Sequence, residues 1–251
     1  MYSVGIIGCG FIATEAPDNH AQAYIDNPNT EITCFIDTDN SKAIKAYEKF
    51  GLQHFTYDTG TGYDLTGTRP THFDIASICT PIGDGKFWSR FHRVSDAVKL
   101  HGAKAILLEK PIAYSLEEAD RIIEYCKDNN IILVVNHQRR FINPKFTFSR
   151  GIVHTGTHAF DLIRKLFGEI ADVHLDRVYT ESGVVVEIEY VDSDAGQFTL
   201  DCTRSTERMI PNVINYIVWC LDNGYIQQLF ANEARRDLEV CLEYQKLYSE
   251  K

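Results

Sequence analysis

Short apolar runs alternate with longer amphipathic stretches through the first half of the chain. Apolar runs of a few residues, bounded by glycine or polar residues, suit strands that are buried on both faces of a parallel sheet. The pattern predicts five such strands, at residues 4–7, 32–36, 75–79, 105–108 and 131–135. Helical patterns lie between them, at 41–50, 91–100 and 115–129. This repetition predicts right-handed β-α-β crossovers and a doubly wound parallel sheet of the α/β class.

The predicted helix at 115–129 has the clearest start. Ser115 is a good N-cap, and Glu118 stands three residues later. In a capping box, each of these side chains accepts a hydrogen bond from the backbone N–H of the other residue. The pair therefore predicts a capping box at this position.

The pattern changes near Asn136. A helix is expected at 156–167, and then three strands joined by short polar turns at 173–178, 184–190 and 197–202. Short strands with such turns are typical of an antiparallel sheet. Two more helices are expected at 212–221 and 232–248. The sequence predicts two domains, residues 1–135 with the parallel sheet and residues 136–251 as a reduced α+β domain with an open sheet.

Composition narrows the class of protein. The 251 residues are 44% hydrophobic and 24% charged, as in ordinary globular proteins, and the formal net charge is −10. An acidic chain argues against general binding to nucleic acid or to anionic membranes. No apolar run approaches the ~20 residues of a membrane span, and no signal peptide is evident. The seven cysteines form no C-x-x-C pair, so we expect reduced thiols in a cytoplasmic protein and no metal site.

A glycine-rich turn follows the first predicted strand and fits the pattern G-x-G-x-x-A. Its residues are Gly8-Cys9-Gly10-Phe11-Ile12-Ala13. The first glycine permits a tight turn, the second lets the backbone approach a pyrophosphate, and the small third residue allows close packing of helix on strand. The following helix would present free N–H groups to the phosphates. The alternative is a plain corner between a strand and a helix.

Asp37 ends the second predicted strand and lies 24 residues after Ala13. An acidic residue near this spacing binds the ribose hydroxyls of a dinucleotide. Its carboxylate would also repel a 2′-phosphate, and no arginine follows it directly. The carboxylate and the absence of a following arginine therefore favour NAD over NADP as the cofactor, with a solvent-exposed Asp37 as the alternative.

Further motifs stand at three later places in the chain. These are Thr80-Pro81 with His92 downstream, Glu109-Lys110-Pro111, and Asn136-His137-Gln138-Arg139-Arg140-Phe141 followed by Gly156-Thr157-His158-Ala159-Phe160-Asp161. Together with the glycine turn, they resemble the glucose-fructose oxidoreductase, inositol dehydrogenase and rhizopine-catabolism (Gfo/Idh/MocA) family. The resemblance covers roughly residues 1–168.

The resemblance implies a Rossmann domain, a second open-sheet domain and a sugar-like small-molecule substrate bound against the nicotinamide. It also implies a homo-oligomer and hydride transfer at a hydroxyl or keto carbon of a sugar, nucleotide sugar or cyclitol. The implied catalytic residues are Lys110 and His158, and the spacing adds Asp161 as a third candidate. The expected cofactor contacts are Gly8, Gly10, Phe11, Ile12, Ala13, Asp37, Thr80, Pro81, His92, Glu109, Lys110, Gln138 and Arg139.

The chemistry of these residue types fits such a reaction without the resemblance. A carbinol carbon loses hydride only as its hydroxyl proton is taken up, and a histidine with an ordinary pKa near ~6.5 can accept that proton at neutral pH. An ammonium beside the oxygen stabilises developing alkoxide charge. Asp161 stands three residues after His158, so on a helix the two are neighbours, and the aspartate either orients the histidine or faces solvent.

The sequence departs from the family pattern in two respects. Many members have an aspartate four residues before the catalytic histidine, where this chain has His154, and the connection over 142–155 is short. The second domain is therefore reduced. Two alternatives to an enzyme stay open: a nicotinamide-binding redox sensor or assembly partner without turnover, and an α/β binding module independent of NAD.

Overall fold

The computed structural model describes residues 1–51, 56–58, 72–81, 89–137, 145–148, 163–164, 168–173, 177–181, 185–190, 199–201, 209–229 and 231–249. The chain forms two compact units. Unit 1 comprises Met1–His137 and Val213–Lys251, and unit 2 comprises Gln138–Asn212. The structure thus differs from the predicted second domain at 136–251, because the C-terminal segment belongs to unit 1.

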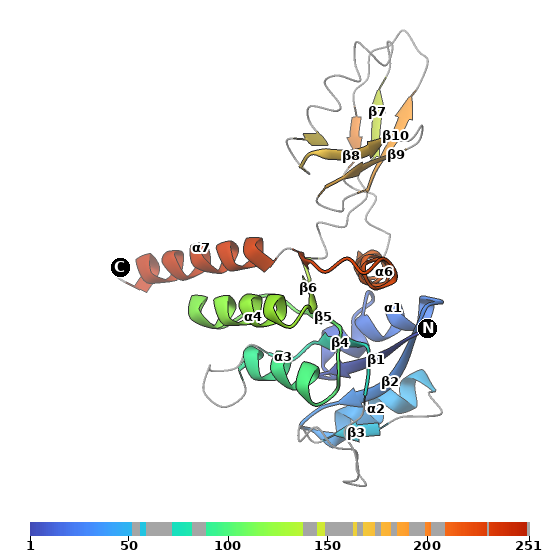
Figure 1. Ribbon diagram of the computed structural model, residues 1–251, viewed down its shortest axis with the longest axis vertical. Helices are drawn as coiled ribbons and strands as arrows, with labels where there is room; N and C mark the ends of the chain where they lie inside the picture. Colours follow the sequence, from blue (N-terminus) through green and yellow to red (C-terminus); the bar gives the residue numbers. More distant parts are fainter. Residues whose placement is uncertain are drawn as a thin grey trace. The chain divides into compact units, whose positions relative to one another are not determined.

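Unit 1 is built on a sheet in which all neighbouring strands are parallel (Figure 1). Its strands, in spatial order, are β12 (Gln228–Leu229), β6 (Ile132–Val135), β5 (Ala105–Leu108), β4 (Ile75–Ile78), β1 (Tyr2–Ile7), β2 (Thr30–Ile36) and β3 (Thr56–Asp58). The prediction of a doubly wound parallel sheet is confirmed. The order from β3 to β6 is that of a dinucleotide-binding fold, with the switch in direction between β1 and β4.

Helices cover both faces of this sheet (Figure 1). Helices α3 (Arg90–Lys99), α4 (Leu116–Asp128) and α7 (Ala231–Ser249) supply residues to one continuous apolar core with the strands. On the other face, Phe50 of α2 (Asn40–Phe50) stacks on Phe35 of β2 at 6.1 Å between ring centroids. The side chain of Asn27, which follows α1 (His20–Asp26), donates to Asn215 Oδ1 of α6 (Met209–Asp222) at 2.8 Å.

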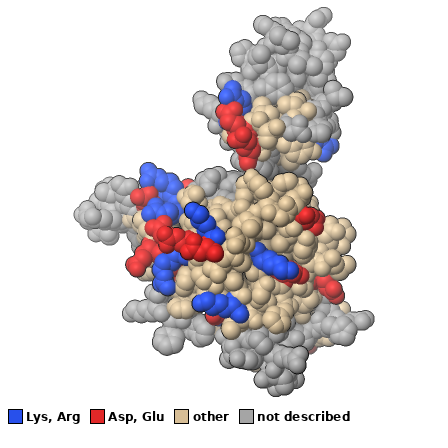
Figure 2. Space-filling model, viewed as in Figure 1, with Lys and Arg blue, Asp and Glu red and all other residues tan. Residues whose placement is uncertain are grey.

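The C-terminal segment joins unit 1 through both backbone and side chains. Leu133 N donates to Gln227 O at 2.9 Å, and β12 extends the sheet beside β6. In α7, Ala231, Ala234 and Leu238 are buried in the same core. Arg235 Nε lies 2.5 Å from Asp120 Oδ1 of α4, and Figure 2 shows acidic and basic side chains together over these two helices. A pattern of apolar positions alone does not tell which domain such a helix covers. The predicted boundary therefore assigned the C-terminal segment to the second domain instead of unit 1.

The start of α4 differs from the predicted capping box in one half. Ser115 Oγ accepts from Glu118 N at 3.2 Å, as predicted. The Glu118 carboxylate, however, accepts from Tyr114 N at 3.0 Å and from Phe91 N at 3.1 Å instead of Ser115 N. The glutamate therefore ties α4 to the first turn of α3.

Among its described residues, unit 2 contains a five-stranded sheet with the order β11-β7-β10-β9-β8. Its strands are β7 (Lys145–Phe148), β8 (Ile170–Val173), β9 (Arg177–Thr180), β10 (Val185–Tyr190) and β11 (Thr199–Asp201). The pairing is antiparallel except between β7 and β10.

One predicted strand of unit 2 is wrong. Residues 173–178 contain the end of β8 and the start of β9, and Val173 faces Val178 across the antiparallel pair. Alternating apolar positions do not distinguish one strand from two that fold back on each other. The predicted helix at 156–167 lies outside the described residues, apart from helical residues 163 and 164.

Candidate active site

The glycine turn at the end of β1 has the geometry that its sequence requires. Gly8 has φ +91°, and a Cβ there would lie 2.8 Å from Thr80 N, so only glycine fits without strain. A Cβ on Gly10 would meet no atom within 4 Å, which leaves open space beside the backbone. These are the positions where a dinucleotide fold needs a tight turn and a close approach of phosphate. The turn therefore fits a bound pyrophosphate.

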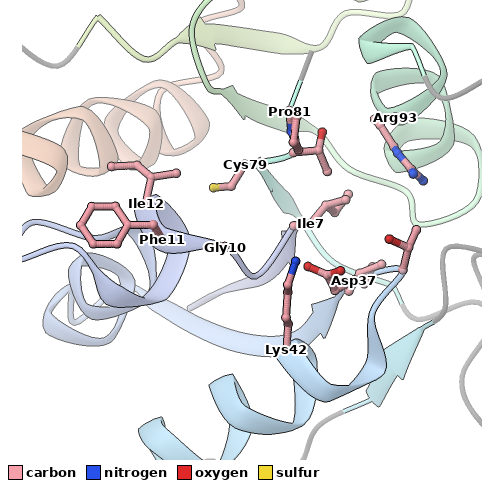
Figure 3. A pocket seen from close by; sticks show the side chains of 13 residues that line it. Ile7, Gly10, Phe11, Ile12, Asp37, Lys42, Cys79, Pro81 and Arg93 are labelled. Carbon is pink, nitrogen blue, oxygen red and sulfur yellow. The ribbon is translucent and has the colours of Figure 1, made fainter. Parts of the chain in front are cut away.

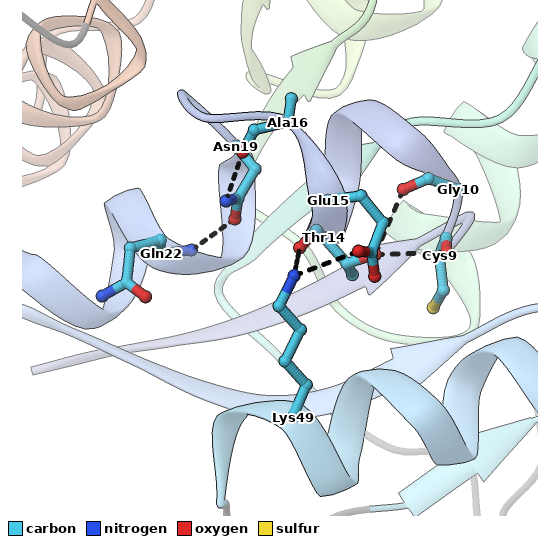
Figure 4. A network of polar contacts seen from close by, with 8 residues as sticks. All are labelled: Cys9, Gly10, Thr14, Glu15, Ala16, Asn19, Gln22 and Lys49. Atoms are coloured by element: carbon cyan, nitrogen blue, oxygen red, sulfur yellow. Dashed lines mark hydrogen bonds and ion pairs between the residues drawn. The ribbon is translucent and has the colours of Figure 1, made fainter.

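The segment after this turn differs from the predicted helix. Phe11–Glu15 form one π-helical turn, and α1 begins only at His20, capped by Asn19. Pro17 explains the break, because proline lacks a backbone N–H and disfavours a helical residue before it. Figure 4 shows the contacts that hold this turn: Thr14 Oγ1 lies 3.3 Å from Gly10 O, and Lys49 Nζ donates to Thr14 O.

A pocket of about 720 Å³ opens at the carboxyl ends of β1, β2 and β4. This size lies in the usual range for a small-molecule site, and the place is the switch point of the sheet. Figure 3 shows its lining, which comprises Ile7, Gly8, Gly10, Phe11, Ile12, Ile36, Asp37, Thr38, Lys42, Cys79, Thr80, Pro81 and Arg93.

Asp37 ties the glycine turn to the start of α2 at the edge of this pocket. Its Oδ2 accepts from Cys9 N in the glycine turn at 2.8 Å, and its Oδ1 accepts from Asp39 N at 2.8 Å. Each carboxylate oxygen has two lone pairs, so both oxygens keep capacity for ribose hydroxyls. The carboxylate is thereby fixed at the pocket edge, with both oxygens able to accept further hydrogen bonds.

The Glu-Lys-Pro motif follows β5 at the same edge of the sheet. Leu108 pairs with Ile78, and Glu109 N donates to Ile78 O at 3.0 Å. Lys110 is therefore level with Thr80, which lines the pocket, and the Lys110 side chain is exposed. The Lys110–Pro111 peptide bond is cis. This arrangement presents an ammonium beside the cofactor edge of the sheet.

Glu109 points into the protein, away from that edge. Its side chain is 9% exposed, and its Oε1 accepts from Asn136 Nδ2 and lies 2.8 Å from His20 Nε2. Burial acts to raise the Glu109 pKa, but His20, Asn136 and Lys110 together outweigh burial, so the pKa is lowered. The carboxylate is therefore held by side chains rather than directed to the pocket.

The predicted site residues fall into three groups. Gly8, Gly10, Phe11, Ile12, Asp37, Thr80 and Pro81 line the pocket, and Ala13 is buried behind it. Glu109, Lys110 and His92 are described but are not among its lining residues. The exposed His92 lies in the first turn of α3, where its Nδ1 is 2.8 Å from Ser89 Oγ. The remaining predicted residues, Gln138, Arg139, His158 and Asp161, lie outside the described residues, as does His154.

Sequence reasoning missed two cations of the pocket. Lys42 extends from α2 toward Asp37, and Arg93 extends from α3 into the same end of the pocket (Figure 3). Arg93 directly follows His92, so the predicted cofactor contact on α3 is one residue away from the residue that lines the pocket. Lys42 is five residues after Asp37, whereas the sequence prediction considered only the residues directly after Asp37.

A parallel sheet with this strand order, a tight glycine turn and a carboxylate at the end of β2 defines a dinucleotide-binding α/β protein. Residues 2–137 match the Gfo/Idh/MocA family, which is described as an oxidoreductase family with an NAD-binding Rossmann fold. Since the match spans more than half of the chain, the chain belongs to this family. The predicted resemblance and the nicotinamide dinucleotide cofactor are thereby confirmed.

Two curated relatives illustrate the similarity. An uncharacterized oxidoreductase of Streptococcus pneumoniae is 27% identical over 173 residues, which cover 69% of this chain and 38% of the relative. The D-glucoside 3-dehydrogenase of Escherichia coli is 26% identical over 138 residues, which cover 55% of this chain and 35% of the relative. The chain thus matches well under half the length of each.

The fold also resembles solved structures. A crystal structure of an oxidoreductase from Agrobacterium radiobacter in complex with NAD+, L-tartaric acid and magnesium has a TM-score of 0.56. Its identity is 17%, and the match covers 93% of this chain and 92% of that one. Within the described ranges, no helix is long and apolar enough to cross a membrane. The cytoplasmic location and the homo-oligomer stay predictions.

Proposed function

We propose that this protein is an NAD(P)-dependent oxidoreductase that acts on a hydroxyl or keto carbon of a sugar, nucleotide sugar or cyclitol. The observation that carries the proposal is the shared edge of unit 1. There the pocket with Asp37 and the exposed Lys110 lie at the carboxyl ends of strands in one sheet. The D-glucoside 3-dehydrogenase among the relatives supports a sugar substrate.

The chain's own residues would share the work as follows. The glycine turn and Asp37 would bind the cofactor, whose nicotinamide ring supplies hydride chemistry when bound. The Lys110 ammonium would stabilise negative charge on the reacting oxygen. His158, outside the described residues, would take up or return the hydroxyl proton, with Asp161 as its neighbour.

The experiment is a nicotinamide absorbance assay with NAD and NADP against a panel of sugars, cyclitols and nucleotide sugars. Lys110→Ala is the test variant. Lys127→Ala, which removes an exposed lysine from α4, is the matched control. Turnover that is lost in Lys110→Ala and kept in Lys127→Ala supports the proposal. Saturable NADH binding without turnover on any substrate contradicts it and favours the non-catalytic sensor.

A further inference from the structure

We propose that His20 is a positioning residue for Lys110, because it holds and neutralises the buried carboxylate of Glu109, the residue directly before that lysine. The importance of Lys110 rests on the proposed function. The contacts of His20 do not, so they can be tested without turnover.

His20 bridges three segments that are far apart in the sequence. It starts α1 and is fully buried. Its Nε2 lies 2.8 Å from Glu109 Oε1, 89 residues away, and its Nδ1 lies 2.7 Å from Ser77 Oγ in β4. A doubly protonated imidazole satisfies both contacts, because it donates from both nitrogens. The ring therefore connects the segment after the glycine turn to the Glu-Lys-Pro motif.

Glu109 is fixed along its whole length. Asn136 donates to its carboxylate, Arg90 donates to its carbonyl oxygen, and its N–H donates to Ile78 O. Lys110 consequently leaves the sheet from a backbone position that β4, α3 and β6 all constrain. Such constraint matters because an error of about 1 Å in the placement of a catalytic group can reduce the rate roughly 100-fold.

The charges of His20 and Glu109 oppose each other across a distance of 2.8 Å. Burial acts to lower the His20 pKa, but the neighbouring Cys79 and Glu109 outweigh burial and raise the pKa to about 10. Since the Glu109 pKa is lowered, His20 and Glu109 are both charged at neutral pH, and their opposite charges cancel. The other ionisable groups packed here are the buried guanidinium of Arg90 from α3 and the buried phenol of Tyr24 from α1.

This balance has a consequence for Lys110. An isolated buried carboxylate is unfavourable, and its charge acts on groups beside it. Without the imidazolium, the negative charge of Glu109 would be opposed only by the buried Arg90 guanidinium, and more of its field would reach the ammonium of the adjacent Lys110. That field would stabilise the ammonium and so slow the reaction of the amine with an acylating reagent.

The test is brief labelling with acetic anhydride at mildly alkaline pH, read by mass spectrometry as the ratio of Lys110 to Lys127 acetylation in the same digest. In His20→Gln we expect this ratio to fall roughly threefold to tenfold. In Glu109→Gln, which has no carboxylate charge, it should not fall. In the double variant it should return to within about twofold of the native value. The matched control is His101→Gln, which alters a buried histidine near the other end of β5.

Each outcome decides the proposal. An unchanged ratio in folded His20→Gln overturns it, and so does an equal fall in the single and double variants, since a purely structural role predicts that result. If His20→Gln fails to fold, Glu109→Gln and the double variant decide: slower labelling in either contradicts the neutralising role. Native protein that binds no NADH would refute the proposed function, while the labelling ratios would still decide the role of His20.

Discussion

The two ends of the candidate site lie on one sheet edge but are built differently. The cofactor end consists of a backbone turn and one partly exposed carboxylate. Both can be recognised in the sequence, the turn by its glycines and the carboxylate by its place at the end of a strand. The lysine end presents one exposed ammonium above buried His20, Glu109 and Asn136, whose positions in the chain are far apart. We therefore expect cofactor binding to depend on the local geometry of the glycine turn and Asp37. The reactivity of Lys110 should depend on the opposite charges of buried His20 and Glu109.

The largest expected effect separates the two ends directly. In Lys110→Ala, kcat should fall roughly 10²–10³-fold because the charge beside the reacting oxygen is lost. NADH affinity should stay within about threefold, since Lys110 is not among the residues that line the pocket. Steady-state kinetics and fluorescence titration measure the two quantities. A variant that loses binding and turnover in parallel would show that the ends are not separable.

Two glycine substitutions sharpen the account of the cofactor end. Gly8→Ala should lower the free energy of unfolding by about 2–4 kcal/mol, because φ +91° and Thr80 N leave no room for a Cβ. Gly10→Ala should leave stability within about 1 kcal/mol but weaken NADH binding, since its Cβ enters open space that the pyrophosphate needs. Chemical denaturation with parallel NADH titrations distinguishes them. Equal losses of stability would contradict the assignment.

The buried pair predicts a pH dependence of stability. His20 has a raised pKa, so its contribution is complete below its ordinary value of 6.5 and is lost as pH rises toward about 10. Glu109 has a lowered pKa, so its contribution is present above its ordinary value of 4.5 and is lost as pH falls.

The difference in unfolding free energy between native protein and the doubly substituted His20→Gln/Glu109→Gln protein should therefore be largest near pH 5–6.5. It should decline on the alkaline side by on the order of 2 kcal/mol. Urea denaturation across this pH range measures it. A difference that stays flat would show that the pair is not ionised as the structure indicates.

The smallest expected effect concerns cofactor choice. Lys42 lines the pocket on the side of Asp37. Lys42→Ala should weaken NADPH binding by roughly twofold to fivefold and NADH binding less, because an exposed lysine contributes a modest attraction to a 2′-phosphate. Competitive titration with both cofactors is the measurement. Equal losses for the two would remove Lys42 from cofactor selection.

The fold of unit 1 could be predicted from sequence because its strands are continuous apolar runs and its turn carries glycine signals. Local patterns carry no information on partners, so the return of α7 to unit 1 and the diversion of Glu118 to Tyr114 and Phe91 were not predicted. His20 was missed for the same reason: a histidine at the start of a helix gives no sign that it meets a carboxylate 89 residues later. The break between Phe11–Glu15 and α1 was not predicted, although Pro17 disfavours a continuous helix there.

Fluorescence titration of NADH into native protein and into Asp37→Ala tests the central claim most directly. The account predicts saturable binding to the native protein and a loss of roughly tenfold to 100-fold in affinity in the variant, since the carboxylate that binds ribose and holds Cys9 N is removed. Equal affinity in the two proteins, or no binding to either, would contradict the assignment of this pocket to the nicotinamide dinucleotide.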